Sequence, residues 1–307
     1  MRRALIALLS LSLAAPTLTS QIPSTDPRFG EDPREQPDDP RKLHDDPRRD
    51  EVEQRALLRT DQLRGAEQFE LLDSEGKKAE LASAIGAQPW ELLGWIDSMC
   101  ESWLALRERA SWDTAETQLE ANSLRAKLER SALLADQTIG DTAFSAWVAR
   151  VLAWDDEQIA RYRHAQVLFK QGLTAFNEAT SAQHALRALT PLRQAQEQLQ
   201  PLGTTWEAIT TLSLIGRIQM ANGQQDGARE TLQEALRMGR SLRDRDAVWN
   251  GIAVLLDDAI RQADYNGAEK LLAEQYRISM ETGDQASADD VIRRLTDLTR
   301  YRQLTHQ

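Results

Sequence analysis

The chain has 307 residues, of which 41% are apolar and 28% charged, the composition of an ordinary folded domain. A single cysteine excludes a disulfide scaffold and any multi-cysteine metal site, and four histidines leave little room for a histidine-built metal centre. The 48 acidic residues outnumber the 37 basic ones, and the net charge is −11. This balance argues against nucleic acid as the main partner, because phosphate binding needs clustered Lys and Arg.

Residues 1–20 have the three-part pattern of a secretory signal peptide. A short basic start is followed by an apolar run from Ala4 to Ala15 and then by small polar residues. The run is too short for a membrane-spanning helix, which needs about 20 residues. We therefore expect cleavage between Ala15 and Gln21, and a mature chain that is periplasmic or extracellular and does not span a membrane.

Residues 21–50 contain Asp-Pro-Arg four times, starting at Asp26, Asp32, Asp39 and Asp46. Proline prevents regular helix and disfavours helix in the residue before it, and the segment has almost no apolar residues to bury. We expect a disordered linker. The alternative is a docking motif that presents charges at a fixed interval.

Residues 51–162 form a tryptophan-rich region in which apolar residues recur at helical spacing. One predicted helix over 89–110 carries the stripe Leu92, Ile96, Met99, Trp103 and Leu106. Ser111 and Asp141 are the predicted N-caps of the next two helices, and Asp155 with Gln158 is typical of a capping box that starts another. Packing in the core is the favoured role of the tryptophans over a ligand cage, and Cys100 is predicted to be an inert core residue.

The C-terminal half shows a period of 40 residues. Ala188, Ala228 and Ala268 recur at this interval, and each is followed four residues later by leucine, at Leu192, Leu232 and Leu272. Ala195 and Ala235 continue the series, which Gln275 breaks. Within one unit, Gly216 is a small residue in the middle of a first helix, and Asn222-Gly223 is a turn before the second helix.

This pattern resembles the tetratricopeptide repeat in its longer form of about 40 residues, over 163–307. The resemblance implies an all-α fold: a right-handed α–α solenoid of antiparallel helix pairs, closed by a capping helix over 284–302. Residues 51–162 are expected to extend the stack with degenerate units. The resemblance also implies that the first helices line a concave groove for a peptide or a helix. Projection of the pattern places the following residues at that groove: Asn177, Arg217, Met220, Ala221, Asn250, Asp257 and Arg261.

No phosphate-binding loop, nucleophile elbow or HExxH motif occurs in the sequence. His164 and His184 have no second ligand at helical spacing. The acidic run Asp155–Glu157 and the pair Asp257-Asp258 are better explained by helix capping and a solvated face than by acid–base catalysis. No catalytic residue, metal ligand or cofactor is predicted.

Three hypotheses for function remain open at this point. The first is an exported, non-catalytic scaffold that binds a protein or peptide partner. The second is a regulatory or sensor subunit that acts with a separate effector. The third is a carbohydrate-active helical enzyme that uses the tryptophan-rich half, which requires a deep pocket with two facing carboxylates.

Overall fold

The computed structural model describes residues 63–109 and 111–305, and within these ranges every regular element is a helix and no strand occurs. The prediction of an all-α chain is therefore confirmed for the described part. The predicted signal peptide and the Asp-Pro-Arg linker lie outside the described residues.

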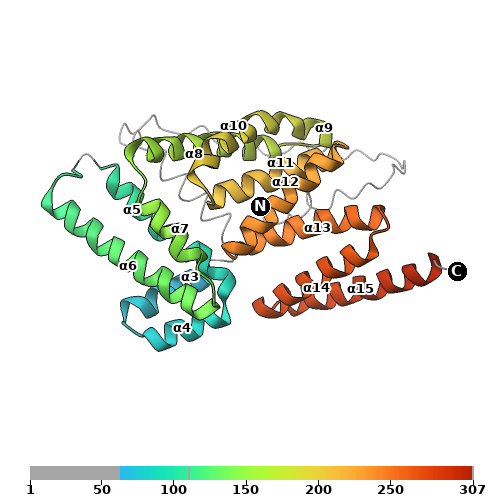
Figure 1. The fold of residues 1–307 in the computed structure, drawn as a ribbon, viewed down its shortest axis with the longest axis horizontal. Coiled ribbons are helices and arrows are strands. Elements are labelled where there is room, and N and C mark those ends of the chain that lie inside the picture. Colours follow the sequence, from blue (N-terminus) through green and yellow to red (C-terminus); the bar gives the residue numbers. More distant parts are fainter. Residues whose placement is uncertain (1–62, 110, 306–307) are drawn as a thin grey trace, which may run out of the picture. The chain divides into compact units, whose positions relative to one another are not determined.

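The described part of the chain is a succession of α-helices (Figure 1), with three short 3-10 helices between residues 89 and 202. The elements and their bounds are α3 (Leu63–Ser74), α4 (Lys78–Ala87), η2 (Pro89–Glu91), α5 (Leu92–Arg107), α6 (Ala115–Ile139), α7 (Ala143–Leu152), α8 (Asp156–Asn177), α9 (Ala182–Ala185), η3 (Leu186–Ala188), α10 (Leu189–Leu199), η4 (Gln200–Leu202), α11 (Trp206–Ala221), α12 (Gln225–Ser241), α13 (Arg245–Arg261), α14 (Tyr265–Thr282) and α15 (Gln285–Thr305).

The start of α8 is the predicted capping box. The Asp155 carboxylate accepts from the backbone N–H of Gln158 at 2.8 Å, and the Gln158 side chain accepts from the backbone N–H of Asp155 at 3.0 Å. The start of α6 differs from the prediction. Its N-cap is Thr114, whose hydroxyl accepts from the backbone N–H of Thr117, whereas Ser111 lies in the preceding turn. Both residues are good cap formers, so composition alone does not separate them.

The start of α7 also differs from the prediction. Asp136, in the last turn of α6, accepts the backbone N–H groups of Phe144 and Ser145 at 3.0 and 2.8 Å. Asp141 bonds instead to the backbone of its neighbour Thr142. The cap of α7 is thus supplied by the preceding helix, which brings α6 and α7 together across a tight turn.

The tryptophan-rich region is packed as predicted. The five residues of the α5 stripe are buried, and so are five of the six tryptophans between 90 and 154. Trp112 is the half-buried exception, and the Arg107 guanidinium lies 4.9 Å from its ring centroid. Trp154 is buried just beyond the end of α7 rather than inside it. Cys100 is buried, and burial raises the pKa of its thiol well above the ordinary value.

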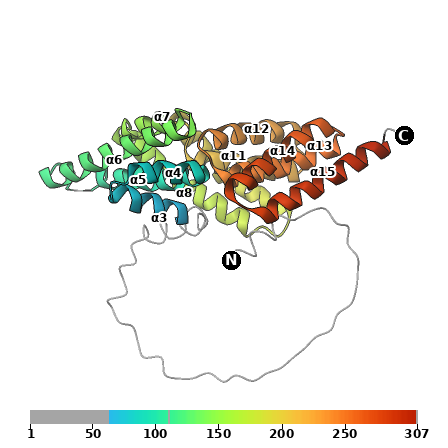
Figure 2. The same ribbon diagram turned by 90° about the horizontal axis from the view of Figure 1, so that it is seen from below.

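The 40-residue period appears as recurring burial on equivalent helices. The repeated small and leucine positions are at most 1% exposed, and they are Ala188, Leu192, Ala195, Ala228, Leu232, Ala235, Ala268 and Leu272. Helix α11 packs on α12, α13 on α14, and α15 on α14. Figures 1 and 2 both show α14 and α15 lying along each other.

The small residues permit close approach of paired helices. A Cβ atom at Gly216 of α11 would lie 2.6 Å from Cγ of Leu232 on α12, and a Cβ atom at Gly172 of α8 would lie 2.5 Å from Cγ of Leu192 on α10. Both distances are far below van der Waals contact. Each leucine therefore fills the space that a glycine leaves on the facing helix.

Gly216→Ala should lower the free energy of unfolding by about 1–3 kcal/mol, because the added methyl group overpacks the contact with Leu232. The matched control is Gly227→Ala in the first turn of α12, where a Cβ atom meets nothing within 4 Å. This control should be neutral or stabilising by up to about 1 kcal/mol, since alanine favours helix over glycine. Urea unfolding followed by circular dichroism measures both changes, and equal effects would contradict the close-packed contact.

Gln275→Met should stabilise the protein by about 1–2 kcal/mol, because a buried amide without partners costs its full desolvation. Gln275 occupies the position of Ala195 and Ala235 and is 0% exposed, and neither its Nε2 nor its Oε1 has a hydrogen-bond partner among the described residues. Gln233→Met, on the exposed face of α12, is the control and should be neutral. A fall in melting temperature for Gln275→Met would show that the amide is satisfied.

Candidate functional site

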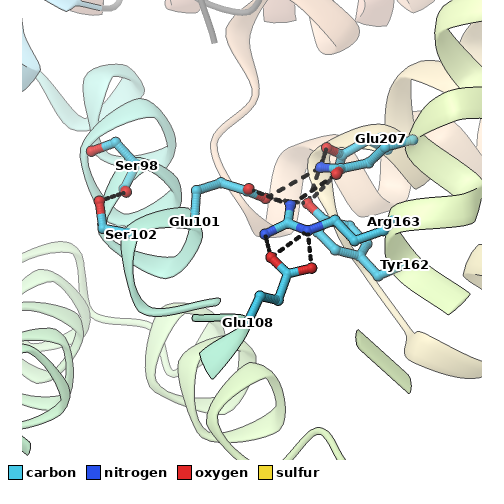
Figure 3. A network of polar contacts seen from close by, with 8 residues as sticks. Ser98, Glu101, Ser102, Glu108, Tyr162, Arg163 and Glu207 are labelled. Carbon is cyan, nitrogen blue, oxygen red and sulfur yellow. Dashed lines mark hydrogen bonds and ion pairs between the residues drawn. The ribbon is translucent and has the colours of Figure 1, made fainter. Parts of the chain in front are cut away.

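A buried polar network lies where α5, α8 and α11 meet (Figure 3). Tyr162 and Gln166 are one turn apart on α8, so both face the same neighbours, and they are 3% and 7% exposed. Helix α5 contributes Glu101, and the first turn of α11 contributes Glu207, which is only 1% exposed. The network joins the tryptophan-rich region to the repeats.

The Tyr162 hydroxyl lies between two carboxylates. Its oxygen is 2.8 Å from Oε1 of Glu101 and 3.0 Å from each carboxylate oxygen of Glu207. The Gln166 amide bridges the same pair, with Nε2 at 3.0 Å from Glu207 and 3.3 Å from Glu101. Two glutamates from distant parts of the sequence thus share their donors.

Arg163 lies at the solvent-facing side of the network. Its Nη1 donates to Glu101 at 2.7 Å, and its Nε and Nη2 donate to Glu108 at 3.0 and 2.8 Å. Burial alone would lower the pKa of Arg163, but Glu101 and Glu108 raise it above its usual value, so the guanidinium stays charged. Two nitrogens of the Arg163 guanidinium thus bind the Glu108 carboxylate together, and this bidentate geometry gives the strongest hydrogen bonding between an arginine and a carboxylate.

Two facing carboxylates are the feature required by a helical enzyme acting on sugars. Here the Glu207 carboxylate is buried, and both of its oxygens accept protein hydrogen bonds. An acid–base catalyst must reach a substrate proton directly or through one water. The arrangement therefore favours a structural junction between helices.

The second candidate site is the series of positions expected at a groove. Asn177, Arg217 and Asp257 are 40 residues apart, at the end of α8 and late in α11 and α13. Asn177 and Asp257 are exposed, and Arg217 is half-buried. Asp257 lies 4.0 Å from Arg294 of α15.

Arg217 differs from the other arginines of these three helices because its charge has no counter-ion among the described residues. The guanidinium lies 5.1 Å from the centroid of the Phe176 ring, a cation–π contact. Within the described part of the chain, no carboxylate pairs with it. Burial lowers the pKa of Arg217, with no opposing contribution from an acidic group of these ranges.

The other residues predicted to line the groove differ in how far they are buried. Asn250 is half-buried and Arg261 is exposed, with a weak ion pair to Asp258 at 3.7 Å. Met220 is 9% exposed and belongs to a hydrophobic cluster of α11–α14, so it contributes to the core. Asp258, expected at a surface, is buried and accepts from Arg229 of α12 at 2.9 Å.

Two features of the network have no signal in the sequence. Glu207 in the first turn of α11 is explained equally well by a favourable interaction with the helix dipole. Tyr162 occupies an apolar position of α8, and its hydroxyl partners lie 61 and 45 residues away. Only the packing of α5 against α8 and α11 brings these groups together.

Among the described residues, no group of three His, Cys, Asp or Glu side chains could hold a metal ion. The helices of the described ranges also include none with the length and apolarity that crossing a bilayer requires. Comparison with known proteins found no matching family model, no matching curated protein and no matching solved structure.

Arg163→Met should lower the free energy of unfolding by about 2–3 kcal/mol, because it leaves Glu101 and Glu108 partly buried without their cation. Arg237→Met is the control. Arg237 pairs with Glu234 on the exposed face of α12, and loss of such a pair costs about 0–1 kcal/mol. Urea unfolding of the two variants should separate them, and similar midpoints would show that the junction contributes nothing beyond a surface pair.

Proposed function

We propose that this protein is an exported, non-catalytic interaction module that binds a peptide or protein partner in the concave surface of a tetratricopeptide-like array. In this proposal the helix pairs from α8 to α14 form a right-handed α–α solenoid, and α15 caps its last pair. The first helices of the pairs, α8, α11 and α13, line the binding surface. The signal-like N-terminus supports export.

The uncompensated charge of Arg217 within the described ranges is the observation that carries the proposal. Arg217 is half-buried, so its guanidinium has lost part of its hydration, which is unfavourable unless a counter-ion or hydrogen-bond acceptors replace it. Phe176 supplies only a weak substitute. A site that keeps such a cation is suited to a ligand that brings a carboxylate, because a guanidinium forms two parallel bonds with that group.

The neighbouring positions fit the same purpose. Asp257 presents a carboxylate at the position of α13 equivalent to Arg217, and Asn177 presents an amide at the end of α8. Both residues are exposed. These groups match the donors and acceptors of a peptide backbone. A partner that spans several units would then place an acidic group at Arg217.

Arg217→Gln should weaken binding of carboxylate-bearing peptides about 10-fold to 100-fold, since hydrogen bonds to a charged group contribute about 1.5–3 kcal/mol. The probes are three pools of random decapeptides. One pool is amidated and contains Asp and Glu, the second has a free C-terminal carboxylate but no Asp or Glu, and the third has neither carboxylate. Affinity selection on the purified full chain, read by mass spectrometry, ranks the pools.

The matched control for this experiment is Arg237→Gln, which removes an arginine of equal charge from the exposed face of α12. It should leave selection unchanged. The first two pools distinguish a side-chain carboxylate from a chain terminus as the preferred group. Failure of every pool to bind would count against the interaction module, whereas equal binding by wild type and Arg217→Gln would remove Arg217 from the site.

A further inference from the structure

Trp90 belongs to the N-terminal helices by sequence but to the repeats by packing. It lies on the three-residue helix η2, which packs against α3, α4 and α5. Its side chain is 2% exposed and is part of the hydrophobic cluster that includes Leu236 of α12, Val248 of α13 and Ile278 of α14. One indole therefore connects helices that are far apart along the chain.

Polar contacts fix the position of this indole. Trp90 Nε1 donates to Oε2 of Glu281 at 2.7 Å, and Glu281 lies in the last turn of α14. The Arg243 guanidinium lies 5.6 Å from the indole ring, and Arg243 follows the end of α12. The ring thus contacts the C-terminal ends of two successive second helices.

Arg243 is held in a conformation that suits glycine. The turns after η4, α12 and α14 contain Gly203, Arg243 and Gly283 at 40-residue intervals, with φ of 86°, 53° and 69°. Side chains other than glycine are disfavoured at positive φ. The turn that receives Trp90 carries arginine instead of glycine, and this arginine contacts the indole. Strained residues persist where the surrounding contacts hold them.

The turn that lies 40 residues before Arg243 also meets the N-terminal helices. A Cβ atom at Gly203 would collide with the Arg150 guanidinium of α7. Residues of the N-terminal helices therefore reach two turns that are 40 residues apart, the turn of Gly203 through Arg150 and the turn of Arg243 through Trp90. The contact between Trp90 and Arg243 is therefore one of two contacts that join the N-terminal helices to these turns.

We infer that Trp90, Arg243 and Glu281 form a latch through which the N-terminal helices set the angle between the α11–α12 and α13–α14 hairpins. In a repeat array each unit contacts only its neighbours. A side chain that packs between the ends of two neighbouring hairpins, as Trp90 does, therefore controls the orientation of one hairpin relative to the other. The inference rests on the proposed function, because the same angle sets the spacing of Arg217 and Asp257. Release of the latch and binding of a partner are then energetically coupled.

Arg243→Gly tests the latch, because it removes the cation over the indole and restores the glycine of the equivalent turns. Ala263→Gly is the matched control. Ala263 is the other described non-glycine residue at positive φ, 58°, and it lies in the turn between α13 and α14. Both variants relieve backbone strain, but only the first changes a contact of Trp90.

Arg243→Gly should raise amide exchange at 89–91 and 241–248 by about threefold to thirtyfold, the range expected for loss of a cation–π contact. It should also change the affinity for the carboxylate-bearing peptide pools by about fivefold or more. Ala263→Gly should alter neither quantity. Trp90→Leu keeps an apolar side chain but removes the aromatic face over which the Arg243 guanidinium lies, so in a double-mutant cycle it should cancel most of the effect of Arg243→Gly.

Three results would overturn the inference: equal exchange in the two glycine variants, faster exchange with unchanged peptide affinity, or additive effects of Trp90→Leu and Arg243→Gly. If no peptide pool binds wild type while the exchange difference is present, the proposed function fails and the latch contact itself stands. The two failures are therefore distinguishable.

Discussion

Close approach of antiparallel helices at small residues is the constraint on which the rest of the described structure depends. Where Gly172 or Gly216 removes side-chain bulk, a leucine of the facing helix enters the space. The two leucines that fill these spaces, Leu192 and Leu232, are 40 residues apart, so the same contact joins two successive helix pairs. Arg217 and Asp257 lie four residues before the ends of α11 and α13, whereas Asn177 is the last residue of α8.

Two arginines show how the same side chain serves structure or binding according to its neighbours. Arg163 is surrounded by Glu101, Glu108 and Gln166, and these acceptors hold the junction of α5 and α8 together. Within the described ranges, Arg217 has only the Phe176 ring. A satisfied cation needs no ligand, whereas an unsatisfied one lowers its free energy by binding an anion. In the proposed function, α11 therefore carries recognition, and the tryptophan-rich region supports it through Trp90 and the polar network.

Features determined by neighbours in sequence were predictable, and features determined by distant contacts were not. The capping box at Asp155 and the buried Ala–Leu series were predicted correctly, because each depends on spacing within a single helix. The caps at Thr114 and Asp136 were missed since several residues near each helix start are suitable. Arg217 was named from its register. Three other features depend on which helices pack together, and no pattern within a single helix predicts such packing. They are the lack of a counter-ion for Arg217 in the described part of the chain, the burial of Glu207 and the packing of Trp90 against the repeats.

The central claim is that Arg217 receives a carboxylate from a partner bound along the first helices. A crystal structure of the full chain with the tightest-binding selected peptide tests it most directly. We expect a ligand carboxylate oxygen about 2.7–2.9 Å from a guanidinium nitrogen of Arg217, with the peptide passing Asn177 or Asp257. A peptide bound elsewhere, with the Arg217 guanidinium still stacked on Phe176 and unpaired, would contradict it.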